Sequence, residues 1–437
     1  MAFQQGLSGL NVSSKAIDAT SHNIANSSTV GYKAGVSHFA DVYAASLNGN
    51  GASQIGIGAN LAAIQQQFTQ GNITTTNNPL DVSINGGGFF RMDSSGAITY
   101  TRNGQFHLDK SGYIINDQGM VLTGYSVQNG NITQTLVPLQ VSASYLTPQA
   151  TGSNPSSPFQ GVKANVNLDS RATVPLNAWV NGGAPGDTAS YTPDPTTYNF
   201  ATGTTIYDSL GNPHSLMFYF RKTDNGSEWE VYANLDGTTN QNVVPGGGPI
   251  GTLTFDALGQ ISGGNPMNVT FDIFNTMVSQ GQPNGNGALP TQTFPIDFLG
   301  TTQFGTAFSP NRIEQDGYSA GSLVGVSVSS DGTILASYSN SKTYVMGQVA
   351  LVNFTNPNGL RSIGNNQWVE TGDSGSPMVG TPNTSGRGVL SSYTVEESNV
   401  DLTAELVNLI TFQRNYQANA QSIKTQDQVM QTLVNLR

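Results

Sequence analysis

The sequence predicts a mixed fold that is mainly β, built from nested sandwich- or barrel-like domains, with a long coiled-coil-like helix at each end. Only 10 % of the 437 residues are charged and 51 are glycine, whereas about 25 % charge and roughly 7 % glycine are usual. Short runs of β-forming residues, each closed by turn residues, fill the middle of the chain. Apolar residues spaced three and four apart mark both ends as helical.

The first helix is expected over residues 1–26. Small and apolar residues recur there at steps of four and three, so they share one stripe of a helix. This N-terminal stripe consists of Phe3, Leu7, Leu10, Ser14, Ile17, Ser21 and Ile24. A polar run at 26–29, followed by Gly31, ends the pattern.

A connecting arm is expected to follow the first helix. Residues 42–80 contain no charged side chain. Asn-Gly pairs at 48–51 and a polar run at 71–79 flank a short piece at 61–68 that could be helical or extended.

Three β blocks are expected after the arm. The first has strands at 81–85, 89–92, 98–102 and 106–108, the second at 204–208, 215–221 and 228–235, and the third at 323–328, 334–338 and 343–354. If both terminal helices lie along one axis, the chain between them must lead away from that axis and come back to it. The third block is therefore expected to pair with the first. The predicted division is a terminal helical domain with its arm (1–80 and 395–437), a discontinuous inner β domain (81–147 and 311–394) and an outer β domain inserted into it (148–310).

The last helix is expected over residues 398–437. Ser398 followed three residues later by Asp401 fits a capping box, and neither Pro nor Gly interrupts the helix afterwards. At 1.5 Å per residue it would be on the order of 50 Å long. Its C-terminal stripe consists of Leu402, Leu406, Leu409, Tyr416, Ala420, Ile423, Met430 and Val434, interrupted by Gln413 and Asp427.

The pairing of the two terminal helices favours self-assembly. A lone amphipathic helix is more often an ordinary surface helix, but here each helix has no helical partner except the other and their copies in neighbouring molecules. The charges in residues 1–70 cancel, and residues 395–437 hold three basic and five acidic groups. The middle therefore carries −9 of the net −11, and the ends can pack together with little charge repulsion.

No catalytic, metal or cofactor site is predicted. The acidic pI of about 4.6 argues against nucleic acid as a partner, the chain has no cysteine, and no apolar run is long enough to span a membrane. Residues 372–377 resemble the nucleophile loop of a serine protease, but none of the four histidines has a protease-like context. The recurrent Asp-x-x-Gly motifs have one carboxylate each and fit type I turns better than calcium loops.

The two ends resemble a known family. Residues 21–33 are similar to the N-terminal signature of the bacterial flagellar axial proteins, which are the rod, hook and hook-associated proteins. Residues 397–402 and 409–419 resemble the C-terminal signature of the same family. The N-terminal signature residues are Asn23, Ile24, Ala25, Asn26, Gly31, Tyr32 and Lys33. Within that group, the chain length, the opening at 3–10, the Gly-Gly-Gly-Phe-Phe turn at 86–90 and the Asp208 motif at 205–212 resemble the hook proteins.

The resemblance implies a non-enzymatic structural subunit that polymerises into a curved, flexible tube, the universal joint between flagellar rod and filament. It implies an extracellular protein, exported by the flagellar type III apparatus without a cleaved signal peptide, with Phe3 and Leu7 in the export element. The implied partners are copies of the chain itself and the distal rod, hook cap, hook-length control and hook–filament junction proteins. The residues expected to pack along the axis are Phe3, Leu7, Leu10, Ile17, Ile24, Leu402, Leu406, Leu409, Tyr416, Ile423, Met430 and Val434.

Two other functions fit part of the sequence. A distal rod or other axial protein would share both signatures, but such proteins typically lack a large outer domain. A secreted β-sandwich adhesin is disfavoured because both terminal signatures are matched.

Overall fold

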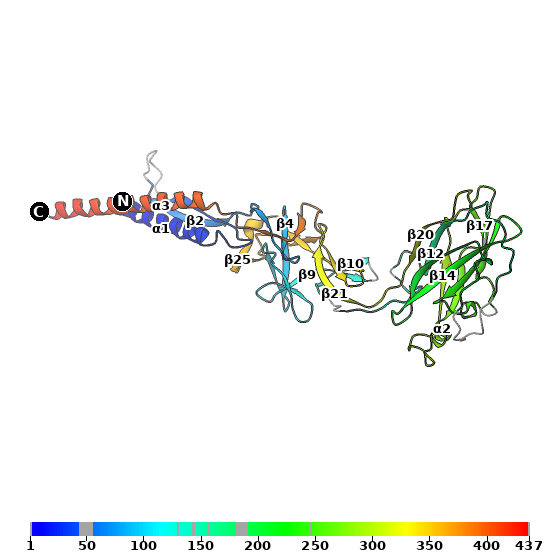
Figure 1. Cartoon of the computed structure of the whole chain (residues 1–437). Helices are drawn as coiled ribbons and strands as arrows, with labels where there is room; N and C mark the ends of the chain where they lie inside the picture. The colour runs from blue at the N-terminus through cyan, green and yellow to red at the C-terminus, as the bar shows by residue number, and fades with distance from the viewer. Residues whose placement is uncertain are drawn as a thin grey trace. The chain divides into compact units, whose positions relative to one another are not determined.

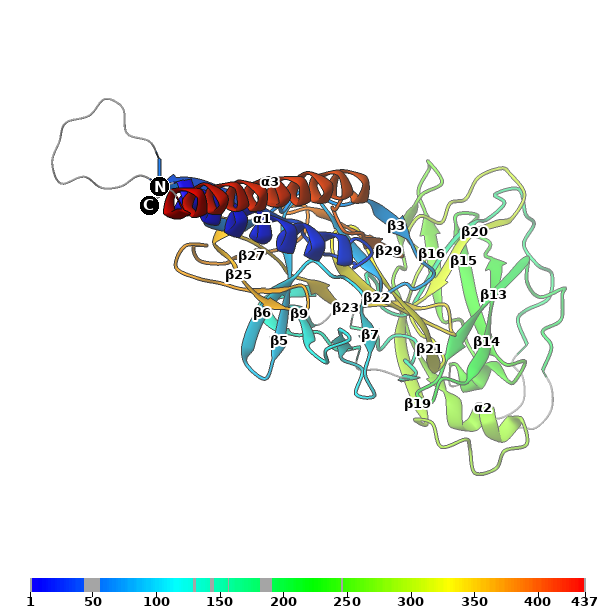
Figure 2. The same cartoon turned by 90° about the vertical axis from the view of Figure 1, so that its left-hand side faces the viewer.

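The computed structural model describes residues 2–42, 56–128, 131–141, 145–155, 157–180, 191–244 and 247–435. These residues form helices at both ends of the chain and many strands between them, so the predicted mainly β fold with terminal helices is confirmed (Figures 1 and 2). The chain divides into two compact units. Unit 1 comprises Met1–Ser142, Gly325–Ala336 and Thr343–Arg437, and unit 2 comprises Ala143–Val324 and Ser337–Lys342.

Unit 1 begins and ends with the terminal helices α1 (Ala2–Ala25) and α3 (Leu402–Asn435). They lie side by side in both views (Figures 1 and 2). The cap predicted at Ser398 is wrong. The Asp401 carboxylate caps α3 instead, accepting hydrogen bonds from the N–H groups of Thr403 at 2.9 Å and Ala404 at 3.1 Å. Ser398 does not serve because it lies between strand β29 (Thr394–Glu396) and α3, four residues before the first residue of the helix.

The arm is mostly extended. Strands β1 (Gly35–Val42) and β2 (Gly58–Gln66) form an antiparallel hairpin that contacts α1. Strand β3 (Ile73–Thr75) pairs with β29 (Thr394–Glu396), immediately before α3. The piece at 61–68 is therefore extended rather than helical, and the Asn-Gly run at 48–51 lies outside the described residues.

The inner β region pairs early strands with late ones. Neighbouring strands of its main sheet follow the order β23-β9-β5-β6-β26-β25, and β4 pairs with β28 in a smaller sheet. An aromatic core of Phe89, Tyr100, Phe354 and Trp368 lies beside this sheet. The early strands are β4 (Val82–Asn85), β5 (Phe89–Ser94), β6 (Ala97–Thr101), β7 (His107–Leu108), β8 (Ile114–Ile115), β9 (Val121–Gln128) and β10 (Asn131–Pro138). The late strands are β22 (Thr333–Tyr338), β23 (Thr343–Val349), β24 (Leu351–Asn353), β25 (Arg361–Gly364), β26 (Gln367–Val369), β27 (Met378–Gly380) and β28 (Val389–Ser392).

Unit 2 is a β-sandwich. One sheet has the order β18-β19-β12-β20, the other is a five-stranded meander from β13 to β17, and residues of both sheets share one hydrophobic core. Asp272 caps the short helix α2 (Ile273–Ser279). The sandwich strands are β12 (Val162–Asn167), β13 (Phe200–Tyr207), β14 (Pro213–Lys222), β15 (Glu228–Leu235), β16 (Gly251–Phe255), β17 (Ile261–Gly263), β18 (Met267–Asp272), β19 (Thr291–Asp297) and β20 (Ser309–Gln315). Outside the sandwich, β11 (Tyr145–Leu146) pairs with β21 (Gly321–Val328), which passes from unit 2 into unit 1 after Val324.

Candidate assembly site

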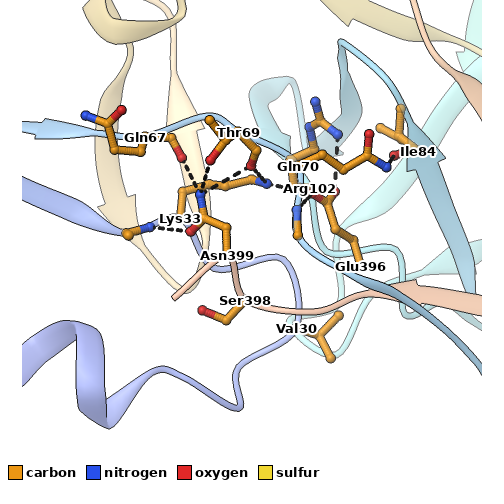
Figure 3. A network of polar contacts seen from close by, with 12 residues as sticks. Val30, Lys33, Gln67, Thr69, Gln70, Ile84, Arg102, Glu396, Ser398 and Asn399 are labelled. Carbon is orange, nitrogen blue, oxygen red and sulfur yellow. Dashed lines mark hydrogen bonds and ion pairs between the residues drawn. The ribbon is translucent and has the colours of Figure 1, made fainter. Parts of the chain in front are cut away.

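A buried ionic junction connects the segment that follows α1 to the segment that precedes α3 (Figure 3). At its centre, Glu396 accepts hydrogen bonds through Oε1 from Lys33 Nζ at 2.6 Å and from the Gly71 N–H at 3.0 Å. Its Oε2 accepts from Arg102 Nη1 at 3.1 Å, and its backbone carbonyl accepts from the Gly31 N–H at 2.8 Å. One glutamate therefore joins the segment after α1, the arm, the inner β region and the segment before α3.

The junction holds two positive charges and one negative charge out of contact with water. The side chains of Lys33 and Glu396 are both 0 % exposed. Lys33 also donates to the Thr69 carbonyl at 2.7 Å, and Arg102 donates through Nη2 to the Gly86 carbonyl at 2.8 Å. Burial lowers the pKa of Lys33, and the interaction with Glu396 opposes that shift. Burial also lowers the pKa of Arg102, and Glu396 again opposes that shift. Removing Glu396 would leave two buried positive charges without an anionic partner.

Asn399 continues the junction toward α3 (Figure 3). Its Oδ1 accepts from the Ala34 N–H at 2.8 Å, and its Nδ2 donates to the Gln67 carbonyl at 2.7 Å and to Thr69 Oγ1 at 2.9 Å. The side chain thus satisfies backbone groups of two segments that lie just outside the paired residues of β1 and β2.

Asn23, on α1, also connects separate segments through its side-chain amide. Its Oδ1 accepts from the Gly35 N–H at 2.9 Å and from the Tyr32 hydroxyl at 3.0 Å. Its Nδ2 donates to the Gly35 carbonyl at 2.9 Å and to Glu405 Oε1 at 3.3 Å, so it also reaches α3. Burial and then the nearby Glu405 raise the pKa of Tyr32 to about 12.

The remaining signature residues shape the end of α1. Asn26 Nδ2 donates to the His22 carbonyl at 2.9 Å. Gly31 has a φ of +71°, and an added Cβ there would lie 2.6 Å from the Asn103 backbone nitrogen, so only glycine fits. Ile24 is half-buried, whereas Ala25 is exposed.

A seam of small or polar residues, distinct from the apolar stripe, forms the more buried face of α1, and its members Gly6, Gly9 and Asn23 contact α3. The seam consists of Gly6, Gly9, Ser13, Ala16, Thr20 and Asn23, again at steps of three and four. An added Cβ at Gly6 would lie 2.9 Å from Ile423 Cγ1, and one at Gly9 would lie 2.6 Å from Asn419 Oδ1. Glycine therefore permits a closer approach of the helices than a larger residue would.

The predicted stripe on α1 lies one residue around the helix from this seam, a turn of about 100°. Phe3 is 52 % exposed and Leu7 47 % exposed, and Leu10, Ile17 and Ile24 are half-buried. In the single chain this stripe is only partly covered.

On α3, the predicted stripe divides between two faces. Leu409 and Ile423 are half-buried, and Ile423 faces Gly6 of α1. The exposed members are Leu402, Leu406, Tyr416, Met430 and Val434. The spacing did not single out three further exposed apolar residues of α3, namely Val407, Ile410 and Val429. No described side chain of α3 is fully buried.

The helices run antiparallel and are unequal in length. Gly6 near the start of α1 faces Ile423, whereas Asn23 near its end reaches Glu405. The last turns of α3 therefore pass beyond the start of α1, as Figure 1 shows. Met430 and Val434, 55 % and 71 % exposed, lie in this overhang.

The described residues show the surroundings of the metal- and protease-like motifs directly. They hold no group of three or more metal-ligating side chains. In the protease-like loop, Ser374 is buried and donates its hydroxyl to the Thr371 carbonyl at 2.8 Å. Across the described part of the chain, no helix is both long and apolar enough to cross a membrane.

Four family models match the chain. Models described as flagella basal body rod protein and as flagellar basal body rod FlgEFG protein C-terminal match residues 3–33 and 391–436. The flagellar hook protein FlgE/F/G D1 domain matches residues 83–147, and the flagellar basal body protein FlaE D2 domain matches residues 167–318. The terminal matches cover nearly all of α1 and the whole of α3, and both are matches to models of flagellar axial proteins.

Full-length relatives narrow that class. The flagellar hook protein FlgE of Salmonella typhimurium is 39 % identical over 449 residues, covering 100 % of both chains, and that of Escherichia coli is 38 % identical with the same coverage. A crystal structure of a Helicobacter pylori flagellar hook protein, 15 % identical, covers 74 % of this chain and 100 % of its own with a TM-score of 0.50, which supports the fold. The chain belongs to the flagellar hook protein family.

Proposed function

We propose that this chain is the structural subunit of the flagellar hook, and that it polymerises through its terminal helices into a curved, flexible tube joining rod to filament. One observation carries the proposal. The helices pair through small residues and so leave apolar side chains on their outer faces, from Phe3 on α1 to Val434 on α3.

The energetics favour copies of the chain as the partner for those faces. Burying one leucine contributes on the order of 2 kcal/mol, and a polymer repeats each such contact in every subunit. The terminal segments carry almost no net charge, so neighbouring helices can approach without strong repulsion. A neighbouring helix pair would present the same apolar surface.

The domain division fits a flexible tube. We infer a terminal helical domain (1–80 and 395–437) that builds the axis, an inner β domain (81–147 and 311–394) around it, and an outer β domain (148–310) whose contacts change as the tube bends. Pairing of the strands at 82–128 with those at 343–392 supports the inner domain.

The other expected partners follow from this role. We infer export through the flagellar type III apparatus without signal-peptide cleavage, and contacts with the distal rod, hook cap, hook-length control and hook–filament junction proteins. Phe3 and Leu7 are exposed and so available for recognition before assembly. We infer a structural role without catalysis.

Leu406→Asp tests the proposal. Leu406 is 45 % exposed, so a carboxylate there remains hydrated in the monomer but carries a desolvation cost of several kcal/mol once a neighbour covers it. We expect no tubes by electron microscopy and loss of motility, while the monomer melts at the wild-type temperature.

Gln417→Ala is the control. Gln417 is exposed on the same helix, and we expect this variant to assemble normally. Normal tubes from Leu406→Asp would overturn the assigned packing face, and unfolding of its monomer would mean that Leu406 belongs to the core of the single chain.

A further inference from the structure

Unit 2 contains a buried histidine, His214, between two carboxylates. This histidine has no role in the assembly proposed above. His214 lies at the start of β14. Its Nδ1 is 2.6 Å from Asp236 Oδ2, and its Nε2 is 3.5 Å from Asp208 Oδ2. Asp208 is as deeply buried as the histidine.

Asp208 shapes the turn that joins β13 to β14. Its Oδ1 accepts from the N–H groups of Leu210 at 2.9 Å and Asn212 at 2.8 Å. Its Oδ2 accepts from Asn212 Nδ2 at 2.9 Å and from Asn286 Nδ2 at 2.8 Å. One carboxylate thus fixes the turn at 208–212 and fastens a second loop to it.

This turn lies against the stem, which we define as residues 145–151 and 316–322, where the chain passes into and out of unit 2. An added Cβ at Gly211 would lie 2.5 Å from Pro148 Cβ and 3.2 Å from Ser319 Cα, so the turn and both stem strands are in close contact. The Tyr207 N–H donates to Thr151 Oγ1 at 3.0 Å, and the Thr151 N–H donates to the Tyr207 carbonyl at 3.0 Å. Movement of the turn would therefore reach the stem directly.

The charge of the His214 ring decides whether it holds both carboxylates. Burial alone would lower its pKa, but Asp236 from the end of β15 and Asp208 from the turn together outweigh burial and raise it. These two carboxylates are the charged groups facing the ring, and the neighbouring loop adds the Asn286 amide. Nε2 has no hydrogen-bond partner among the described residues. A neutral ring would keep its one proton on Nδ1, 2.6 Å from Asp236, and would therefore turn the lone pair of Nε2 toward Asp208.

We propose that protonated His214 is a brace for the stem, holding the 208–212 turn in place through Asp208, and that loss of the ring proton loosens the turn and the stem. The direction of the pH effect follows from the linkage between protonation and folding stability. A histidine whose pKa is raised on folding stabilises fully below its ordinary pKa of about 6.5, and this contribution is lost as the pH rises through the raised value.

Two measurements on the full-length monomer test the brace. NMR of histidine labelled at Cε1 resolves four rings, and we expect the His214 ring to titrate above the ordinary histidine range. Hydrogen exchange, corrected for the intrinsic pH dependence, should show protection at 145–151, 208–212 and 316–322 falling across that titration, by roughly tenfold for each unit by which folding raises the pKa of His214.

His214→Gln removes the titrating group and should make that protection independent of pH. His107→Gln is the control, since His107 is exposed and its contact with Asp117 is 3.7 Å long, and it should keep the wild-type pH dependence. A His214 ring that titrates at or below the ordinary value, or stem protection unchanged across its titration in the wild-type chain, would overturn the brace. Both readouts use wild-type protein, so they hold even if the variant fails to fold.

Discussion

Glu396 shows how a single buried residue can organise two chain ends. Its carboxylate accepts hydrogen bonds from both Lys33 and Arg102, and its carbonyl accepts one from the Gly31 N–H. A buried ion pair adds little net stability compared with apolar packing, but breaking one is costly. The junction therefore specifies one arrangement of the segments more than it strengthens the fold.

Glu396→Gln tests that role at the residue scale. The amide keeps the shape of the side chain but leaves Lys33 and Arg102 without their counter-charge, and we expect unit 1 to lose about 3–5 kcal/mol of unfolding free energy in denaturant titrations. Glu397→Gln is a matched control on the exposed neighbour and should be nearly silent. Equal, small effects of both variants would show that the buried charges are not coupled.

The sequence held only a weak signal for this junction. Lys33 is one of four charges in the first 70 residues, which makes it conspicuous, and the family signature includes it. Nothing local links it to Glu396, which is 363 positions away. Long-range ionic contacts depend on the tertiary fold, so their partners could not be read from spacing.

At the scale of elements, the helices and most strands were predictable because their apolar periods are regular. The face joining α1 to α3 was not. The period identified Phe3 and Leu7 as one stripe, whereas the intramolecular seam uses Gly6 and Gly9. Small residues carry little hydrophobic signal, so their spacing of three and four does not by itself predict a contact between helices. The β1–β2 hairpin was missed because its residues lack a clear alternation of apolar and polar side chains.

Gly6→Leu tests the seam. Leucine has a higher helix propensity than glycine by roughly 0.8 kcal/mol, so α1 itself is strengthened, but the side chain would collide with Ile423. We expect the helix pair to be destabilised by about 1–3 kcal/mol, as for other overpacked contacts, and measured as faster hydrogen exchange at 415–426 in the monomer.

Gln4→Leu places the same side chain on an exposed position of α1 and should leave that exchange unchanged. If Gly6→Leu also exchanged at the wild-type rate, the close approach of the helices at Gly6 would be refuted.

At the scale of the whole molecule, unit 2 should be removable. Gln149 and Tyr318 form an antiparallel bridge, and bridged residues lie about 5 Å apart, so two glycines can replace residues 150–317. We expect the shortened chain to melt cooperatively and to form tubes whose curvature and stiffness differ from wild type, as electron microscopy would show. A shortened chain that folds but forms no tubes would place unit 2 within the assembly core.

The contact between α1 and α3 also sets an order of events. Asn23 and Glu405 are 382 positions apart, and closing so long a loop is slow and entropically costly until the intervening domains have folded. The helix pair is therefore among the last parts of the molecule to form. A chain that ends early, or whose last residues have not yet been delivered, lacks α3 and cannot offer a complete paired surface to its neighbours. Under the assembly proposed above, a truncated chain is therefore expected to be excluded from the polymer.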